Sequence, residues 1–88
     1  MQEKKKIRPK EIFNDFVRDY LKGDIISEND FEIRFLFPGK NKTETEIKDF
    51  IKEKFMDYRI KNDIDSIVYT IAVDLKNNPD YAIIVIGF

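Results

Sequence analysis

The sequence contains no cysteine, no histidine and no tryptophan among its 88 residues. The absence of cysteine excludes disulfides, thiolate nucleophiles, iron–sulfur clusters and cysteine-based zinc sites. The absence of histidine removes the commonest general base and the commonest zinc ligand. Apolar runs are also short: the longest, residues 81–88, has eight residues, far below the roughly 18 that a membrane-spanning helix needs. We therefore expect a protein that is not an enzyme, with no cofactor, no metal and no membrane span.

What the chain does contain is a balance of 42% hydrophobic and 38% charged residues. A chain this apolar is not typical of a disordered protein, and its length is that of one small domain. No apolar segment follows the N-terminal lysines as in a secretory signal, so we expect a cytoplasmic protein. Isoleucine occurs 14 times and lysine 12 times, against two alanines. This bias is typical of AT-rich genomes and is compatible with low-GC bacteria, archaea and their phages or mobile elements.

Charge is distributed unevenly along the chain. Residues 1–10 carry five basic side chains and one acid, a net charge of +4, whereas residues 11–88 have a net charge of −5. We predict a basic, flexible tail over residues 1–8 and a single domain over residues 9–88. Such a tail can neutralise phosphates of a nucleic acid or contact an acidic protein surface, but short basic tails are also common as solvated termini.

The spacing of apolar side chains predicts two helices and three strands. An apolar stripe predicts a helix over residues 9–22, with Pro9 at its first position and Gly23 as the left-handed residue that ends it. Period-two alternation predicts strands over residues 31–37, 67–75 and 81–88, and residues 77–80 predict a turn. Thr43 and Glu46 match a capping box, which predicts a second helix as far as about residue 60. The buried stripe of that helix is expected to be Ile47, Phe50, Ile51, Phe55 and Tyr58.

This α-β-α-β-β order predicts a small α+β domain of two layers, or of three layers if the first helix crosses the sheet. Strand 81–88 is apolar on both faces, which places it in the middle of a three-stranded mixed sheet of order 1-3-2. It is expected to be antiparallel to both neighbours, and a right-handed crossover joins the other two strands. Phe31, Ile33, Phe35 and Phe37 are expected to share the core face. This arrangement occurs in many unrelated domains, so it implies no activity.

A three-stranded sheet has too little width for both helices. Three strands span roughly 10–15 Å, and two helices side by side need nearly 20 Å. We therefore expect the helix over residues 9–22 to overhang the sheet, to cross to its other face or to pack on another chain. The apolar residues that we predict to bind a partner are Phe13, Val17, Tyr20, Leu36 and Val68. A homodimer is favoured because two-fold interfaces are the commonest, and docking on a larger protein is the alternative.

Two further groups of residues suggest an anion site and a metal site, but each group also has a purely structural explanation. Lys40 and Lys42 precede a helix N-terminus, which favours anions, yet a phosphate loop needs two glycines before its lysine and this segment has one. Asp63 and Asp65, with Asp24, Glu28 and Asp30 elsewhere, carry carboxylates that suit Mg²⁺. Aspartate also follows helix ends because it tolerates turn geometry. For both groups the structural interpretation is favoured.

Two functions follow from these observations. The first is a non-catalytic protein-binding module, homo-oligomeric or docking on a larger protein, for example a small regulator or inhibitor from a phage or mobile element. The alternative is a nucleic-acid-binding protein that uses the tail and the loop before the second helix. Its phosphate contacts would be Lys4, Lys5, Lys6, Arg8, Lys40 and Lys42.

Overall fold

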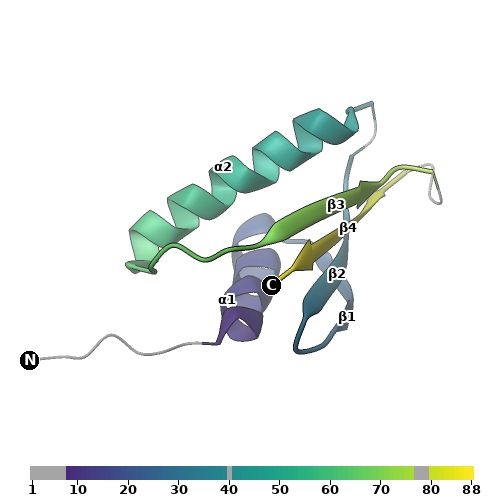
Figure 1. Ribbon diagram of the computed structural model, residues 1–88. Coiled ribbons are helices and arrows are strands. Elements are labelled where there is room, and N and C mark those ends of the chain that lie inside the picture. Colours follow the sequence, from purple (N-terminus) through teal and green to yellow (C-terminus); the bar gives the residue numbers. More distant parts are fainter. Residues whose placement is uncertain (1–7, 40, 77–79) are drawn as a thin grey trace, which may run out of the picture.

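Helices and strands follow one another in the order α-β-β-α-β-β. The computed structural model describes residues 8–39, 41–76 and 80–88. Helix α1 (Pro9–Asp15) continues without a break into a π-helical segment (Phe16–Leu21), and strands β1 (Asp24–Glu28) and β2 (Glu32–Phe37) form a hairpin. Helix α2 (Glu44–Asn62) leads to a second hairpin of β3 (Thr70–Asp74) and β4 (Ala82–Gly87). The result is a small α+β domain with both helices on one side of a sheet (Figure 1).

The sheet has the order β1-β2-β4-β3, and each neighbouring pair of strands is antiparallel. As predicted from its two apolar faces, β4 lies between the other two predicted strands, which therefore run parallel to each other. The prediction of a three-stranded mixed sheet is wrong, because β1 adds a fourth strand beyond β2 and all neighbouring strands are antiparallel. The observed strands are also shorter than predicted, and the predicted turn falls partly on residues 77–79, outside the described residues.

The fourth strand makes the sheet wide enough for both helices, which a three-stranded sheet would not be. Four strands at about 4.8 Å each give a sheet of nearly 20 Å, which accommodates two helices side by side. Helix α1 contacts β2, the π-helical segment contacts β1 and α2, and α2 contacts β3. The first helix therefore neither overhangs the sheet nor crosses it, and the domain has two layers rather than three.

The ends of the helices follow from local chemistry. Helix α1 begins at Pro9 as predicted, but the left-handed residue after the π-helical segment is Lys22, with φ 59°, and not Gly23. Gly23 is required for another reason, since a Cβ there would lie 2.8 Å from the Phe35 ring. Helix α2 begins with the predicted capping box, in which the Glu46 N–H donates to the Thr43 hydroxyl at 3.1 Å and the Thr43 N–H donates to the Glu46 carboxylate at 3.0 Å.

The core lies between the helices and the sheet, and aromatic rings fill the part beneath both helices. Phe13 stacks between Phe55 at 4.6 Å and Phe88 at 5.3 Å, measured between ring centroids. Two residues differ from the prediction. Phe31 belongs to the β1–β2 turn rather than to the strand and is 75% exposed, and Phe50 is 39% exposed with its ring 5.6 Å from that of Phe37. The buried core residues are Ile12, Phe13, Phe16, Val17, Ile33, Phe35, Phe37, Ile47, Ile51, Phe55, Ala82, Ile84 and Ile86.

Candidate functional site

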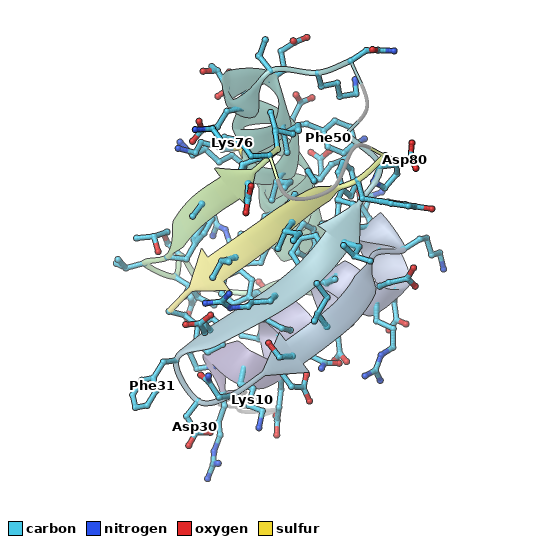
Figure 2. The ribbon with its side chains drawn as sticks, turned by 90° about the vertical axis from the view of Figure 1, so that its right-hand side faces the viewer. Lys10, Asp30, Phe31, Phe50, Lys76 and Asp80 are labelled. Carbon is cyan, nitrogen blue, oxygen red and sulfur yellow. The ribbon has the colours of Figure 1, made fainter. Side chains whose placement is uncertain are left out.

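The side of the sheet that faces away from both helices carries a central apolar patch. Figure 2 looks toward this side, with the strands in front of the helices. We call it the open face. Strand register places Leu36 beside Ile83 and places Val85 between Arg34 and Ala72. The patch therefore consists of Leu36, Ile83, Val85 and Ala72, contributed by β2, β4 and β3, and each of these side chains is half-buried or exposed.

Charged side chains surround this patch. Asp24 and Asp74 lie at the two ends of the row that contains Leu36 and Ile83. Arg34 and Glu32 follow on β2, where the Arg34 Nε donates to the Glu32 carboxylate at 2.7 Å. With three carboxylates and one guanidinium, the rim of the open face has a formal charge of −2.

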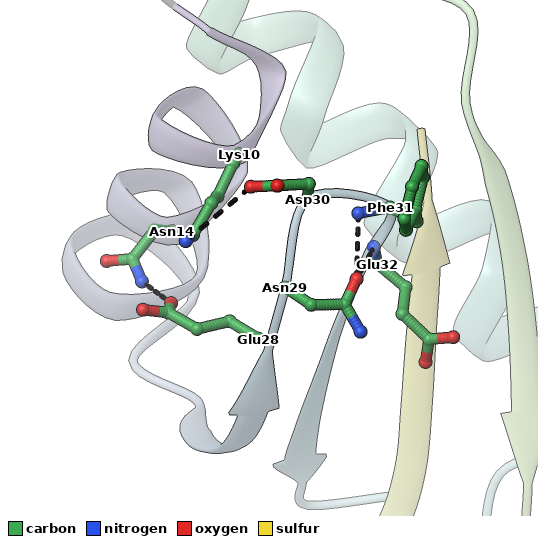
Figure 3. A network of polar contacts seen from close by, with 7 residues as sticks. All are labelled: Lys10, Asn14, Glu28, Asn29, Asp30, Phe31 and Glu32. Carbon is green, nitrogen blue, oxygen red and sulfur yellow. Dashed lines mark hydrogen bonds and ion pairs between the residues drawn. The ribbon is translucent and has the colours of Figure 1, made fainter.

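The acidic residues near the β1–β2 turn hold the hairpin against α1 (Figure 3). Lys10 and Asp30 form an ion pair at 4.0 Å, and the Asn14 amide donates to the Glu28 carboxylate. The side-chain Oδ1 of Asn29 accepts from the backbone N–H groups of Phe31 at 2.7 Å and Glu32 at 2.9 Å. Glu28 and Asp30, for which the sequence left a metal-binding role open, thus both contact side chains of α1.

The second predicted carboxylate pair lies after the end of α2. Asp63 has φ 53°, a left-handed conformation that aspartate tolerates better than most residues, and its N–H donates to the Ile60 carbonyl. The Ile64 N–H donates to the Arg59 carbonyl at 2.9 Å, which completes the helix end. Within the described residues, no group of three or more acidic side chains has a geometry that could hold a metal ion.

The five residues predicted to bind a partner are placed in three different environments. Phe13 and Val17 are fully buried in the core of their own chain, so neither has surface to offer a partner. Tyr20 is half-buried between the two helices, 5.6 Å from the Tyr58 ring, with the Lys61 ammonium over it at 5.5 Å. Leu36 lies in the patch of the open face. Val68 precedes β3 and is 92% exposed.

The basic residues of the predicted nucleic-acid site do not form one surface where the structure describes them. Lys4, Lys5, Lys6 and Lys40 lie outside the described residues. Arg8 and Lys42 are both exposed. The start of α1, which follows Arg8, and the start of α2, which follows Lys42, lie at opposite ends of the domain (Figure 1). Nucleic-acid binding therefore remains a prediction of the sequence.

Sequence reasoning did not single out Ile83 and Val85. The signal was present, because β4 reads Ala-Ile-Ile-Val-Ile-Gly and has no polar side chain on either face. Among the described residues, cover is found on the core face of β4, where Ala82, Ile84 and Ile86 are buried. Ile83 and Val85, which alternate with these residues, lie on the open face.

Three groups on the helix side have altered acidity. Burial raises the pKa of Tyr58, and the nearby carboxylates of Asp15 and Asp19 raise it further. Burial also raises the pKa of Tyr69, against an opposing effect of Arg59. Hydrogen bonds from the Thr43 backbone and hydroxyl lower the pKa of Glu46. All three shifts follow from packing or helix capping and are remote from the open face.

Comparison with models of protein families, with curated proteins and with solved structures finds no significant match to this chain. In the part of the chain that the structure describes, no helix has the length and apolar character needed to cross a membrane. Function is therefore inferred from the surfaces themselves.

Proposed function

We propose that this chain is a non-catalytic protein-binding module and that the open face of its sheet is the binding surface. The observation that carries the proposal is the apolar composition of β4 on both faces, while the described part of the chain covers only one of them. Antiparallel sheets that have one face in water normally carry polar side chains there. A strand with Ile83 and Val85 on the outer face matches a sheet that is buried on both sides.

The composition of this surface suits a protein partner. Contiguous exposed apolar patches with a polar rim are typical of protein–protein interaction sites. Leu36, Ile83 and Val85 provide the apolar centre, and strands hold them in a fixed arrangement, so binding would require little ordering of the surface.

The rim defines the chemistry of that partner. Because the rim carries a formal charge of −2, it favours a protein surface with apolar side chains surrounded by lysine or arginine. The same excess of acid disfavours phosphate groups at this surface. A small regulator or inhibitor that docks on a larger protein is one form of this function.

Capture of a partner from the native host, with three forms of the chain as bait, tests the proposal. Leu36→Lys places a charge in the middle of the open face. Ile60→Lys is the matched control, because Ile60 is 72% exposed on α2, on the other side of the sheet. We expect one protein to bind the original chain and Ile60→Lys equally. It should bind Leu36→Lys at least tenfold more weakly in titration calorimetry, while circular dichroism shows all three folded.

Two outcomes would contradict the proposal. One is the absence of any bound protein, and the other is equal binding of all three forms. Captured nucleic acid whose affinity falls with salt and ignores Leu36→Lys would instead support the alternative function.

A further inference from the structure

Strand β3 lies at the edge of the sheet, yet its amino-acid composition is typical of an interior strand. Among the described residues, the one strand that pairs with β3 is β4. In Figure 1, β3 lies nearer to the viewer than β4, and no other helix or strand lies in front of it. Residues 66–73 contain no charge, proline or glycine, and six of the eight are isoleucine, valine, threonine or tyrosine. Strands of this composition at a sheet edge are templates for pairing with another strand.

The hydrogen-bond pattern shows which backbone groups face outward. The Phe88 N–H donates to the Phe31 carbonyl at 2.9 Å, which makes these two residues a hydrogen-bonded pair of β4 and β2. Even-numbered residues of β4 therefore bond to β2 and odd-numbered residues to β3. Ala72 is opposite Val85, so it bonds to β4. By the same alternation, the N–H and C=O groups of Ile71 and Val73 point to the outer edge.

We propose that two copies of the chain pair through β3, antiparallel and around a two-fold axis at Ala72, to form a continuous eight-stranded sheet. In this register Ala72 lies opposite Ala72 of the second copy and Ile71 lies opposite Val73. Pairs of β-branched side chains stabilise neighbouring strands. The inference rests on the β3 edge and is independent of the function proposed for the open face.

The sequence of β3 is complementary to itself in this register. Thr70 lies opposite Asp74 of the second copy, so no two like charges face each other. An axis at Asp74 would place two carboxylates opposite each other, which is destabilising. An axis at Ala72 also pairs all five residues of the strand. This complementarity of charge and length makes a second copy of the chain the occupant of the edge.

Residues beyond the strand would also face residues of the second copy. Continuing the register places Val68, which is 92% exposed, opposite Lys76 of the second copy, and Tyr69 opposite Leu75. The two open faces lie on the same side of the joined sheet, because the axis is perpendicular to it. A dimer would therefore present two copies of the apolar patch side by side.

Disulfide trapping at Ala72 tests the register directly. Ala72 bonds inward to β4, so it would form a non-hydrogen-bonded pair with Ala72 of the second copy, at a Cα separation of about 4.5 Å. That separation is within the range of disulfides. The chain has no cysteine of its own, so Ala72→Cys introduces one thiol. Ser27→Cys is the matched control, because Ser27 is exposed on β1, on the open face.

We expect Ala72→Cys to form a disulfide-linked dimer at least tenfold faster than Ser27→Cys under mild oxidation at equal concentration, measured on non-reducing gels. Equal rates would overturn the proposed pairing. Failure here leaves the open-face experiment unaffected, because that experiment measures binding of a different protein at Leu36.

Charge exchange provides a second, reversible test. Ala72→Lys and Ala72→Glu each place like charges at the axis, and both should be monomeric by light scattering at concentrations where the original chain dimerises. An equimolar mixture should regain the dimer mass, because the opposite charges then face each other. A mixture that remains monomeric, or an original chain that is monomeric at all concentrations, would contradict the inference.

Discussion

The two edges of the sheet are built differently. Strand β1 has a bulge between Ile25 and Ser27 and carries Asp24 and Glu28 at its ends. Strand β3 pairs with β4 in an unbroken register of five residues and is preceded by an uncharged segment. Bulges and charges are devices by which sheets prevent edge-to-edge association. One edge has both devices, whereas the other has one aspartate, Asp74.

Contacts to the helices also differ between the edges. The β1–β2 hairpin is held to α1 by polar contacts of Glu28 and Asp30. Near β3 the contacts are aromatic: Tyr69, which precedes the strand, lies 5.0 Å from the Phe55 ring of α2. On the β1 side, the bulge and the polar contacts to α1 protect the edge of the sheet from further pairing. The β3 side depends on apolar packing, and no described strand pairs with its outer edge.

The largest expected effect is on the apolar side. Phe55→Ala removes a ring that is 1% exposed and stacks at 4.6 Å on Phe13, and should lower the free energy of unfolding by about 3–5 kcal/mol. Ile25→Ala on β1, where the side chain is half-buried, should cost about 1–2 kcal/mol. Urea denaturation measures both. Equal losses would mean that the two edges depend on the core to the same degree.

Gly23 and Gly87 both lie close to other atoms, but the neighbours of Gly23 are fixed in the core and the neighbour of Gly87 can move. A Cβ at Gly23 would meet the Phe35 ring at 2.8 Å and Val17 at 3.1 Å, both parts of the core. A Cβ at Gly87 would meet the Thr70 hydroxyl at 2.7 Å, which can rotate away. We expect Gly23→Ala to destabilise the fold by about 1–3 kcal/mol, as overpacking does. Gly87→Ala should cost less in the same denaturation experiment, and the reverse order would contradict this distinction.

Asn29→Ala should weaken the β1 side alone. It removes the side-chain oxygen that accepts two backbone N–H groups of the turn, at a cost of about 1 kcal/mol. Hydrogen exchange should show faster exchange in β1 and the turn, with unchanged protection in β3 and β4. Loss of protection throughout the sheet would instead mean that the hairpin and the rest of the sheet open together.

The smallest effect is on the pH dependence of stability. The pKa of Tyr58 is raised in the folded state, so the folded chain holds this proton more tightly than the unfolded chain. The resulting stability is complete below the ordinary tyrosine pKa of about 10 and is lost as pH rises through the higher folded value. Tyr58→Phe should therefore show a smaller loss of stability above pH about 10 in thermal unfolding. An unchanged slope would show that Tyr58 does not titrate differently in the two states.

Much of the fold could be predicted because local and long-range signals agreed. The capping box at Thr43 fixed the start of α2, and the two apolar faces of β4 gave its place between β2 and β3. Strand β1 was missed because Asp-Ile-Ile-Ser-Glu does not alternate, and its bulge breaks the period of two. The turn after it also lacks the glycine that marks most tight hairpins. In place of a glycine, this turn is stabilised by the Asn29 side chain, which accepts two backbone N–H groups.

The missed strand had a direct effect on the predicted site. Without β1 the sheet was too narrow for two helices, and Phe13 and Val17 were assigned to a partner. With β1 present both side chains are buried in the core, and the apolar surface that remains is on the opposite side of the sheet. Leu36 was identified because it alternates with core residues on β2. Ile83 and Val85 were not, since an apolar strand does not reveal which of its faces is covered.

The position of β4 between β2 and β3 has a consequence for how the chain folds. The two hairpins are joined only when β4 pairs with β2, and these two strands are separated in sequence by the whole of α2 and β3. Closing so long a loop costs entropy before any ladder bond forms, which slows folding relative to a helical domain of the same size. Until that step, the edge of β3, whose one charged residue is Asp74, and the apolar faces of β4 are exposed together, so we expect the unfolded chain to have its greatest tendency to aggregate in this C-terminal hairpin.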